Sequence, residues 1–352
     1  MGDLLLITDN PRRAEGLARD FDTSTTCRIH DLYEDALPKS RPELIVSDIE
    51  ALTSDAILRL RRILSQVRGD GVPYLFLVHG NAARAAVQAQ ALGAGGALDV
   101  TAGAKQLLDT LAGMKAQMQP VPPVVQARAV EVRQFFKQAL FSGRPITPSV
   151  ARIGTDLVVR AVDDSGVRDW IWAVQRFDDA THQHCLLVAA LAAAFSGALG
   201  LRMDDRERLT KAALLHDVGK IHVPTAILNK PGKLTDAEMT LVRTHPARGH
   251  AMLVGNGFSD EILAVVRGHH EMLDGSGYPD GLRGTEILDL VRLVTVCDIY
   301  GALIERRSYK PPMPGEKAYI ILQGMTDKLD GDLVRAFRSV AEAFDPGLRN
   351  AA

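Results

Sequence analysis

The stretch that decides the fold of the second half of the chain is L-L-H-D-V-G-K, from Leu214 to Lys220. It closes an alanine- and leucine-rich run that predicts a helix, and Gly219 predicts the point where that helix stops. The neighbouring His216 and Asp217 offer a nitrogen and an oxygen ligand to a hard or borderline metal ion. They are the first candidates for a metal site.

Further motifs follow downstream, and they contain residue types suited to metal or phosphate binding. They are T-H-P with His245, G-H-H-E with His269 and His270, D-G-S-G-Y-P-D-G from Asp274 to Gly281, and V-C-D-I-Y with Asp298. Eight of the ten histidines of the chain lie between residues 182 and 270. A random scatter would not concentrate them there, so the pattern predicts one shared site.

In order and spacing, these motifs resemble the HD-GYP family of metal-dependent hydrolases, which act on the bacterial second messenger cyclic di-GMP. The resemblance covers roughly residues 180 to 335 and includes K-I-H-V-P from Lys220 and I-L-N-K-P-G-K-L from Ile227. It implies an all-helical domain with a binuclear metal site. It also implies hydrolysis of the phosphodiester of cyclic di-GMP to linear pGpG and/or GMP.

Seven side chains are candidate metal ligands: His184, His216, Asp217, His245, His269, His270 and Asp298. All offer nitrogen or oxygen and none offers sulfur, which favours iron or manganese over a structural zinc site. Seven donors exceed what one substrate-binding ion needs, whereas they suit two divalent ions bridged by Asp217. An isolated buried histidine is usually only a hydrogen-bonded core residue, so this interpretation depends on the joint order of the motifs.

The resemblance also implies how the ligands divide between the two ions. One ion is held by His184, His216, Asp217 and Asp298, and the other by Asp217, His245, His269 and His270. Some family members hold a third ion through a glutamate four residues before the first ligand histidine, where this chain has Ala180. We therefore expect two ions.

Candidate substrate-handling residues follow partly from spacing and partly from the resemblance. Lys220 lies three residues after Asp217, on the same helical face, so both are candidate catalytic residues and the ammonium can stabilise charge on a phosphate. The glycines and proline around Tyr278 form a loop that can approach a phosphate or a guanine. The resemblance implies that Arg307 and Lys310 contact the dinucleotide. The alternative for the two lysines and the arginine is a solvated side chain, and for Tyr278 an ordinary turn.

Three places depart from the family pattern. Gly301 replaces a second aspartate, Ile304-Glu305-Arg306 replaces Thr-Ser-Asp, and Leu187 stands where arginine or asparagine is frequent. All candidate metal ligands survive these changes. The departures motivate an alternative function, a catalytically weak or inactive sensor or scaffold that binds cyclic di-GMP or a diguanylate cyclase (GGDEF) protein. A hydrolase of another cyclic dinucleotide is a third hypothesis.

The first part of the chain has a different pattern, in which short apolar runs alternate with helical ones. Strands are expected at Leu4–Thr8, Glu43–Asp48, Pro73–Val78 and Gly96–Val100, and helices from Pro11, Ser54, Ala82 and Ala104. This alternation predicts an α/β doubly wound parallel sheet with helices on both faces. Ligands of such sheets bind at the carboxyl ends of strands, where Asp9 and Asp48 would stand.

This part resembles the receiver domain of response regulators, with Asp48 at the place of the phosphoacceptor. The match is incomplete, because Thr8-Asp9 replaces the usual pair of acids, and Val78 and Val100 replace the usual hydroxyl and lysine. The loss of these Mg²⁺-binding and phosphate-binding side chains favours a pseudo-receiver, which serves for contacts or for homodimerisation. Phosphorylation of Asp48 by a histidine kinase is the alternative.

Length and composition predict the domain plan. With 352 residues and 46% hydrophobic content, the chain is expected to form two globular domains. We expect a receiver-like domain at residues 1–118, a Pro-rich linker and connecting helix at 119–145, and an HD-GYP domain at 146–346. The segment from Gln119 to Pro123 is stiff and cannot continue a helix, which marks the boundary.

Charge and cysteine content limit the expected partners and location. A net charge of -2 and a pI near 6.6 do not provide the basic surface that a nucleic-acid polymer needs. Three scattered cysteines cannot form a disulfide framework, and the first residues show no secretory signal, so we expect a cytoplasmic protein. The charge-free segment Cys185–Leu201 spans only 17 residues and predicts a buried core helix rather than a membrane span.

Overall fold

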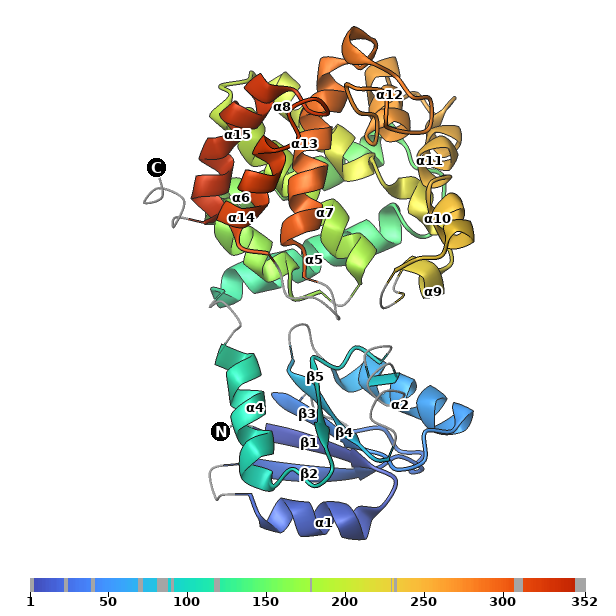
Figure 1. The fold of residues 1–352 in the computed structure, drawn as a ribbon, viewed down its shortest axis with the longest axis vertical. Coiled ribbons are helices and arrows are strands. Elements are labelled where there is room, and N and C mark those ends of the chain that lie inside the picture. Colours follow the sequence, from blue (N-terminus) through green and yellow to red (C-terminus); the bar gives the residue numbers. More distant parts are fainter. Residues whose placement is uncertain are drawn as a thin grey trace. The chain divides into compact units, whose positions relative to one another are not determined.

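The structure is a computed structural model. It describes residues 3–21, 25–38, 42–68, 72–80, 88–89, 92–116, 121–177, 179–228, 230, 233–306 and 313–345. The chain divides into two compact units, Met1–Gln119 and Pro120–Ala352 (Figure 1). The helix expected from Ala82 and the candidate substrate contacts Arg307 and Lys310 lie outside the described residues.

The first unit contains a five-stranded parallel sheet in the order β2-β1-β3-β4-β5. Its strands are β1 Asp3–Thr8, β2 Thr26–Asp31, β3 Leu44–Asp48, β4 Tyr74–Val78 and β5 Gly96–Asp99, and its described helices are α1 Pro11–Arg19, α2 Ser54–Val67 and α4 Ala104–Ala116. The strand order reverses beside β1, which is the doubly wound topology expected. Edge strand β2 was not among the predicted strands, because its sequence T-C-R-I-H-D is largely polar.

Alternating side chains of β1 separate two apolar cores, one on each face of the sheet. Leu5 and Ile7 belong to the core that contains Leu60 of α2, whereas Leu4 belongs to the core that contains Leu107 of α4. Figure 1 shows these helices on opposite sides of the strands. The expected parallel sheet covered on both faces is therefore confirmed.

The second unit is all-helical. Its helices are α5 Pro123–Ala139, α6 Pro148–Val174, α7 Ala180–Ala198, α8 Met203–Leu215, α9 Thr225–Leu228, α10 Asp236–Val242, α11 His245–Leu253, α12 Asp260–Gly268, α13 Asp289–Ile304, α14 Gly315–Gln323 and α15 Gly331–Phe344, with short 3-10 helices η1 Val218–His222 and η2 Gly284–Glu286. Thr147 caps α6 by accepting a hydrogen bond from the Val150 amide. Helix α5, expected as a connection, packs its buried residues Val132 and Phe136 into the core of this unit.

Helix α7 is the centre of the second unit. Every residue from Cys185 to Ala193 is buried, and α6, α8, α13 and α15 pack around this helix. An alanine-rich sequence suits such a position because small side chains let several helices approach closely. The prediction of a buried core helix is confirmed, and none of the described helices combines the length and apolarity needed to cross a bilayer.

Candidate metal centre

Most candidate ligands of the second unit lie at helix ends. They are His216 at the C-cap of α8, Asp217 at the N-cap of η1, His245 at the start of α11, and His269 at the C-cap of α12, followed by His270. Asp298 instead lies within α13 and contacts His184 near the start of α7, 114 residues away in sequence. Packing of these helices brings all seven candidates to one place.

The helix that was expected to run to Gly219 ends earlier. Helix α8 stops at Leu215 and the chain tightens into η1, so the expectation that Gly219 terminates this helix is wrong. A Cβ atom on Gly219 would lie 2.0 Å from the carbonyl oxygen of His245. The glycine therefore lets η1 approach α11 closely, which brings His245 against Asp217.

Lys220 lies on η1 and turns back to Asp217. In a 3-10 helix, residues i and i+3 lie above one another, so the three-residue spacing still places the two side chains together. The Nζ atom donates to Oδ2 of Asp217 at 2.5 Å. Burial alone would lower the pKa of Lys220, but Asp217 outweighs burial and raises it, so the side chain is an ammonium at neutral pH.

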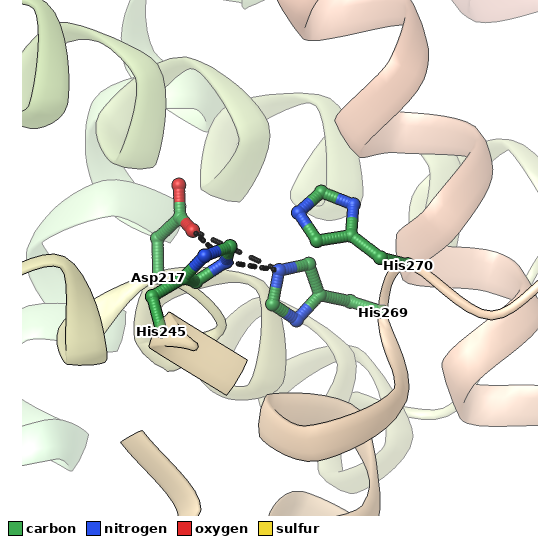
Figure 2. A group of neighbouring side chains, drawn as sticks. All are labelled: Asp217, His245, His269 and His270. Atoms are coloured by element: carbon green, nitrogen blue, oxygen red, sulfur yellow. Dashed lines mark hydrogen bonds and ion pairs between the residues drawn. The ribbon is translucent and has the colours of Figure 1, made fainter. Parts of the chain in front are cut away.

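The candidate ligands form two groups whose donor atoms lie within 4.8 Å of one another: Asp217, His245, His269 and His270, and His184, His216 and Asp298. Asp217 faces both. Its Oδ1 lies 3.0 Å from Nε2 of His245 and 3.7 Å from Nε2 of His269. Figure 2 shows Asp217 facing these two rings. Its Oδ2 lies 3.3 Å from Nε2 of His216 and 3.6 Å from Nε2 of His184. One carboxylate thus presents one oxygen to each group.

Hydrogen bonds to backbone carbonyls determine the tautomers of three of these histidines. The Nδ1 atom of His216 lies 2.6 Å from the Ala213 oxygen, and that of His245 lies 2.7 Å from the Val242 oxygen. His269 is held in the same way by the oxygens of Val265 and Val266 at 3.2 and 3.1 Å. A carbonyl oxygen only accepts, so each Nδ1 carries a proton, and the neutral form of each ring would direct its Nε2 lone pair inward.

In the neutral forms of His245 and His269, the two Nε2 lone pairs face each other without a proton between them. The Nε2 atoms of His245 and His269 lie 3.2 Å apart, and neither carries a hydrogen in its neutral form. The buried Oδ1 of Asp217 lies 3.0 Å from Nε2 of His245 and has no hydrogen-bond partner among the described residues. A divalent cation would satisfy all three atoms, so the residues fit a metal ion.

Electrostatics maintain ligand-competent protonation states in the group around Asp217. Burial would raise the pKa of Asp217, but Lys220 and the adjacent histidines outweigh burial and hold the pKa well below its usual range. Burial lowers the pKa of His245, despite the opposing effect of Asp217. Burial and the neighbouring His269 lower the pKa of His270 far below its usual value. A carboxylate and neutral imidazoles are the forms that bind metal.

His184 has a carboxylate at both of its ring nitrogens. Burial lowers its pKa, but Asp298 at Nε2 and Glu305 at Nδ1, each at 2.9 Å, outweigh burial and raise the pKa to about 10. A metal ion at Nε2 would take the place of the proton there. The Nδ1 atom would keep its proton and donate it in a hydrogen bond to Glu305. The sequence pattern indicated no role for Glu305, because a contact across 121 residues leaves no local signal.

The glycine-rich loop is attached to the ligand segment by a second acid that was not predicted as functional, Glu271. Its buried carboxylate accepts hydrogen bonds from the backbone amides of residues 280, 281 and 282. A Cβ on Gly277 would lie 2.5 Å from the carbonyl oxygen of His270, so only glycine permits this approach. The Tyr278 ring consequently stacks on His270 with centroids 4.7 Å apart, and the Arg243 guanidinium lies over the tyrosine ring at 5.0 Å.

In the first unit, cationic and imidazole groups already surround Asp48. The carboxylate is buried at the end of β3, where its Oδ2 accepts from Nε of Arg13 at 2.8 Å and its Oδ1 contacts Nε2 of His79 at 2.7 Å. Arg13 also donates to Asp9 at 2.8 Å and to Glu50 at 2.9 Å. The sequence pattern indicated no role for Arg13 or His79, because neither occupies a position that the receiver resemblance identifies.

Comparison with known proteins agrees with this geometry. Residues 171–333 match the HD domain family. Over 171 residues the chain is 40% identical to "Cyclic di-GMP phosphodiesterase PA4108" of Pseudomonas aeruginosa, covering 48% of this chain and 41% of that protein. Over 166 residues it is 37% identical to "3'3'-cGAMP-specific phosphodiesterase 3" of Vibrio cholerae, covering 46% of this chain and 36% of that protein. The chain thus spans less than half the length of these curated relatives.

Among solved structures, the chain is similar to Bd1817, an HDG"Y"P protein from Bdellovibrio bacteriovorus, with a TM-score of 0.52 and 18% sequence identity. The similarity covers 68% of this chain and 81% of that chain. The second unit therefore contains an HD domain, the class that its helices and its histidine–aspartate cluster define. Within that class, relatives named as cyclic dinucleotide phosphodiesterases support the expected resemblance. The solved structure, at 18% identity, supports the fold alone.

Proposed function

We propose that the second unit is a metal-dependent phosphodiesterase that hydrolyses cyclic di-GMP to pGpG and onward to GMP in second-messenger signalling. The observation that carries the proposal is the orientation of Asp217, which turns one carboxylate oxygen to each of two histidine groups. The 40% identity to a protein named a cyclic di-GMP phosphodiesterase supports the choice of substrate. We infer that the protein acts in the cytoplasm.

Two divalent ions, of iron or manganese, are the proposed cofactors. His184, His216, Asp217 and Asp298 would hold one, and Asp217, His245, His269 and His270 the other. The all-nitrogen and oxygen donor set favours these metals over structural zinc. When bound, such a pair polarises a phosphodiester and makes a nucleophilic water available near neutral pH.

The other proposed roles belong to side chains around this cluster. Asp217 orients both groups, and Lys220, with 20% of its side chain exposed, can neutralise charge that develops on a phosphate oxygen. Tyr278 lies beside His270 and beneath Arg243, where an aromatic face and a guanidinium can contact a base or a phosphate. We also propose Arg307 and Lys310 as dinucleotide contacts.

The test is hydrolysis of cyclic di-GMP by protein purified without oxygen and loaded with Fe²⁺ or Mn²⁺, with products separated by HPLC. We expect pGpG and then GMP, and no product from the Asp217→Asn variant. An absence of turnover by the fully metal-loaded wild type would sink the proposal. In that case, saturable binding of cyclic di-GMP without product would identify the sensor or scaffold alternative, which could also involve a diguanylate cyclase partner.

A second candidate substrate is 3'3'-cGAMP, because one relative with 37% identity is named for its specificity toward it. The two dinucleotides differ in one base, so the phosphate contacts of the site cannot separate them. A panel of cyclic di-GMP, 3'3'-cGAMP and cyclic di-AMP at equal concentration distinguishes these substrates through their kcat/KM ratios. We expect cyclic di-GMP to give the highest ratio.

A further inference from the structure

His184 is held differently from the other three deeply buried histidines of the cluster. The Nδ1 atoms of His216, His245 and His269 contact backbone carbonyls three or four residues earlier in the chain. The Nδ1 of His184 instead contacts the Oε2 of Glu305, 121 residues away, at 2.9 Å. At Nδ1, this ring is therefore held by a side chain distant in sequence rather than by its own backbone.

The segment that carries Glu305 is fixed by two glutamine amides. Nε2 of Gln175 donates to the carbonyl oxygen of Ile304 at 2.7 Å. The backbone amide of Arg306 donates to Oε1 of Gln183 at 2.9 Å, and Nε2 of Gln183 donates to the Phe177 carbonyl at 2.9 Å. The end of α13 is thus attached to the end of α6 and the start of α7. Only 5% of Glu305 is exposed, so its carboxylate has a defined position.

Asp298, Gly301 and Glu305 follow one another on the face of α13 that is turned to His184. Their order explains why Glu305 supplies the carboxylate at Nδ1. Asp298 contacts Nε2 of His184 from the same helix, and Gly301 lies one turn further along. A Cβ at Gly301 would meet Val188 at 2.9 Å and Leu187 at 3.0 Å, so apolar side chains of α7 occupy that space. Glu305, at the C-cap of α13, is the next residue on this face that reaches the ring.

We propose that Glu305 is a positioning residue that orients His184 for metal binding and keeps the proton on Nδ1. This inference rests on the proposed metal-dependent function. A carboxylate that accepts the second N–H of a ligand histidine fixes the ring and strengthens its free nitrogen as a donor. Loss of Glu305 lowers the affinity for the ion that His184, His216 and Asp298 would hold. It leaves the affinity for the ion that His245, His269 and His270 would hold unchanged.

The experiment is an anaerobic Mn²⁺ titration of the full chain, followed by calorimetry and by the manganese spin-resonance signal, which distinguishes one bound ion from a coupled pair. We compare wild type with Glu305→Ala, Glu305→Gln and the distant Glu342→Gln. We expect two ions in wild type and Glu342→Gln. In Glu305→Ala the affinity for one ion should fall about 10- to 100-fold, with loss of the coupled-pair signal. Glu305→Gln retains an acceptor oxygen and should lie between the two.

Three outcomes would overturn the inference. They are wild-type affinity for both ions in Glu305→Ala, an equal loss of both ions accompanied by a lower unfolding temperature, and no binding of a second ion by wild type. Because the titration needs no substrate, it remains decisive if cyclic di-GMP is not hydrolysed. A wild type that binds two ions without turnover contradicts the proposed activity but leaves the role of Glu305 to be judged by its variants.

Discussion

At the scale of single residues, Asp217 has the greatest influence because both groups share it. Replacement by asparagine keeps the shape but removes the negative charge that two cations would share. We predict that Asp217→Asn abolishes hydrolysis and lowers bound metal to less than one ion per chain, measured by elemental analysis after anaerobic purification. Asp298→Asn is the matched comparison, since Asp298 belongs to the group of His184 and His216, although its Oδ2 also lies 3.5 Å from Nδ1 of His270. This variant should leave one ion bound. Two ions retained by Asp217→Asn would contradict the bridging role.

Lys220 acts at the same scale but on the reaction rather than on metal content. Its ammonium lies 2.5 Å from Asp217 and keeps partial access to solvent, so it can reach a bound phosphate. We predict that Lys220→Met lowers kcat about 100-fold, as for loss of one transition-state donor, and leaves two ions bound. The exposed Lys233→Met variant should have wild-type kcat. Steady-state kinetics with metal analysis of the same samples makes the comparison, and a loss of metal in parallel with kcat would contradict it.

At the scale of elements, the site depends on the close approach of η1 to α11. A methyl group on Gly219 would overlap the His245 carbonyl, and both elements carry candidate ligands. We predict that Gly219→Ala lowers the free energy of unfolding by about 3 kcal/mol and reduces metal binding. The control is Gly197→Ala in α7, where an added Cβ meets no atom within 4 Å and helix propensity favours alanine. Urea unfolding compares the two, and equal stability of both variants would show that the approach is not tight.

At the scale of the whole molecule, the first unit carries the carboxylate Asp48, which already contacts a cationic side chain and a histidine of the same unit. Arg13 and His79 engage both oxygens of the buried Asp48, and valines occupy the positions expected for the hydroxyl and the lysine. We predict that acetyl phosphate with Mg²⁺ does not label Asp48, which favours the pseudo-receiver interpretation. Mass spectrometry of wild type against Asp48→Asn measures the labelling. Stoichiometric labelling of wild type alone would contradict the prediction.

The two compact units also predict how metal removal acts on stability. A ligand that binds only the folded state stabilises the unit that holds it, by about 2.7 kcal/mol at a free concentration one hundred times its Kd. Both candidate groups lie in the second unit. We therefore predict that a chelator lowers the unfolding temperature of the second unit and leaves that of the first unchanged, measured by calorimetry. A change in both transitions would contradict this.

The sequence predicted correctly those elements whose pattern of apolar residues is local. Apolar runs predicted the alternating strands of the first unit, and a charge-free segment of 17 residues predicted the buried helix α7. The sequence pattern did not single out β2, whose polar residues suit an edge strand. It also misplaced the end of α8, since Gly219 is present for a contact with α11 and not for a helix terminus.

The sequence by itself determined which side chains could bind metal, because ligand chemistry belongs to the residue type and motif order is visible in one dimension. Only the tertiary structure decided that Asp217 divides its two oxygens between two groups, and that backbone carbonyls direct the histidine lone pairs inward. It also placed Glu305 against His184 and Arg13 against Asp48. The contacts of Arg13 with Asp48 and of Glu305 with His184 join residues 35 and 121 positions apart, and they depend on how helices and strands pack, which no local pattern records.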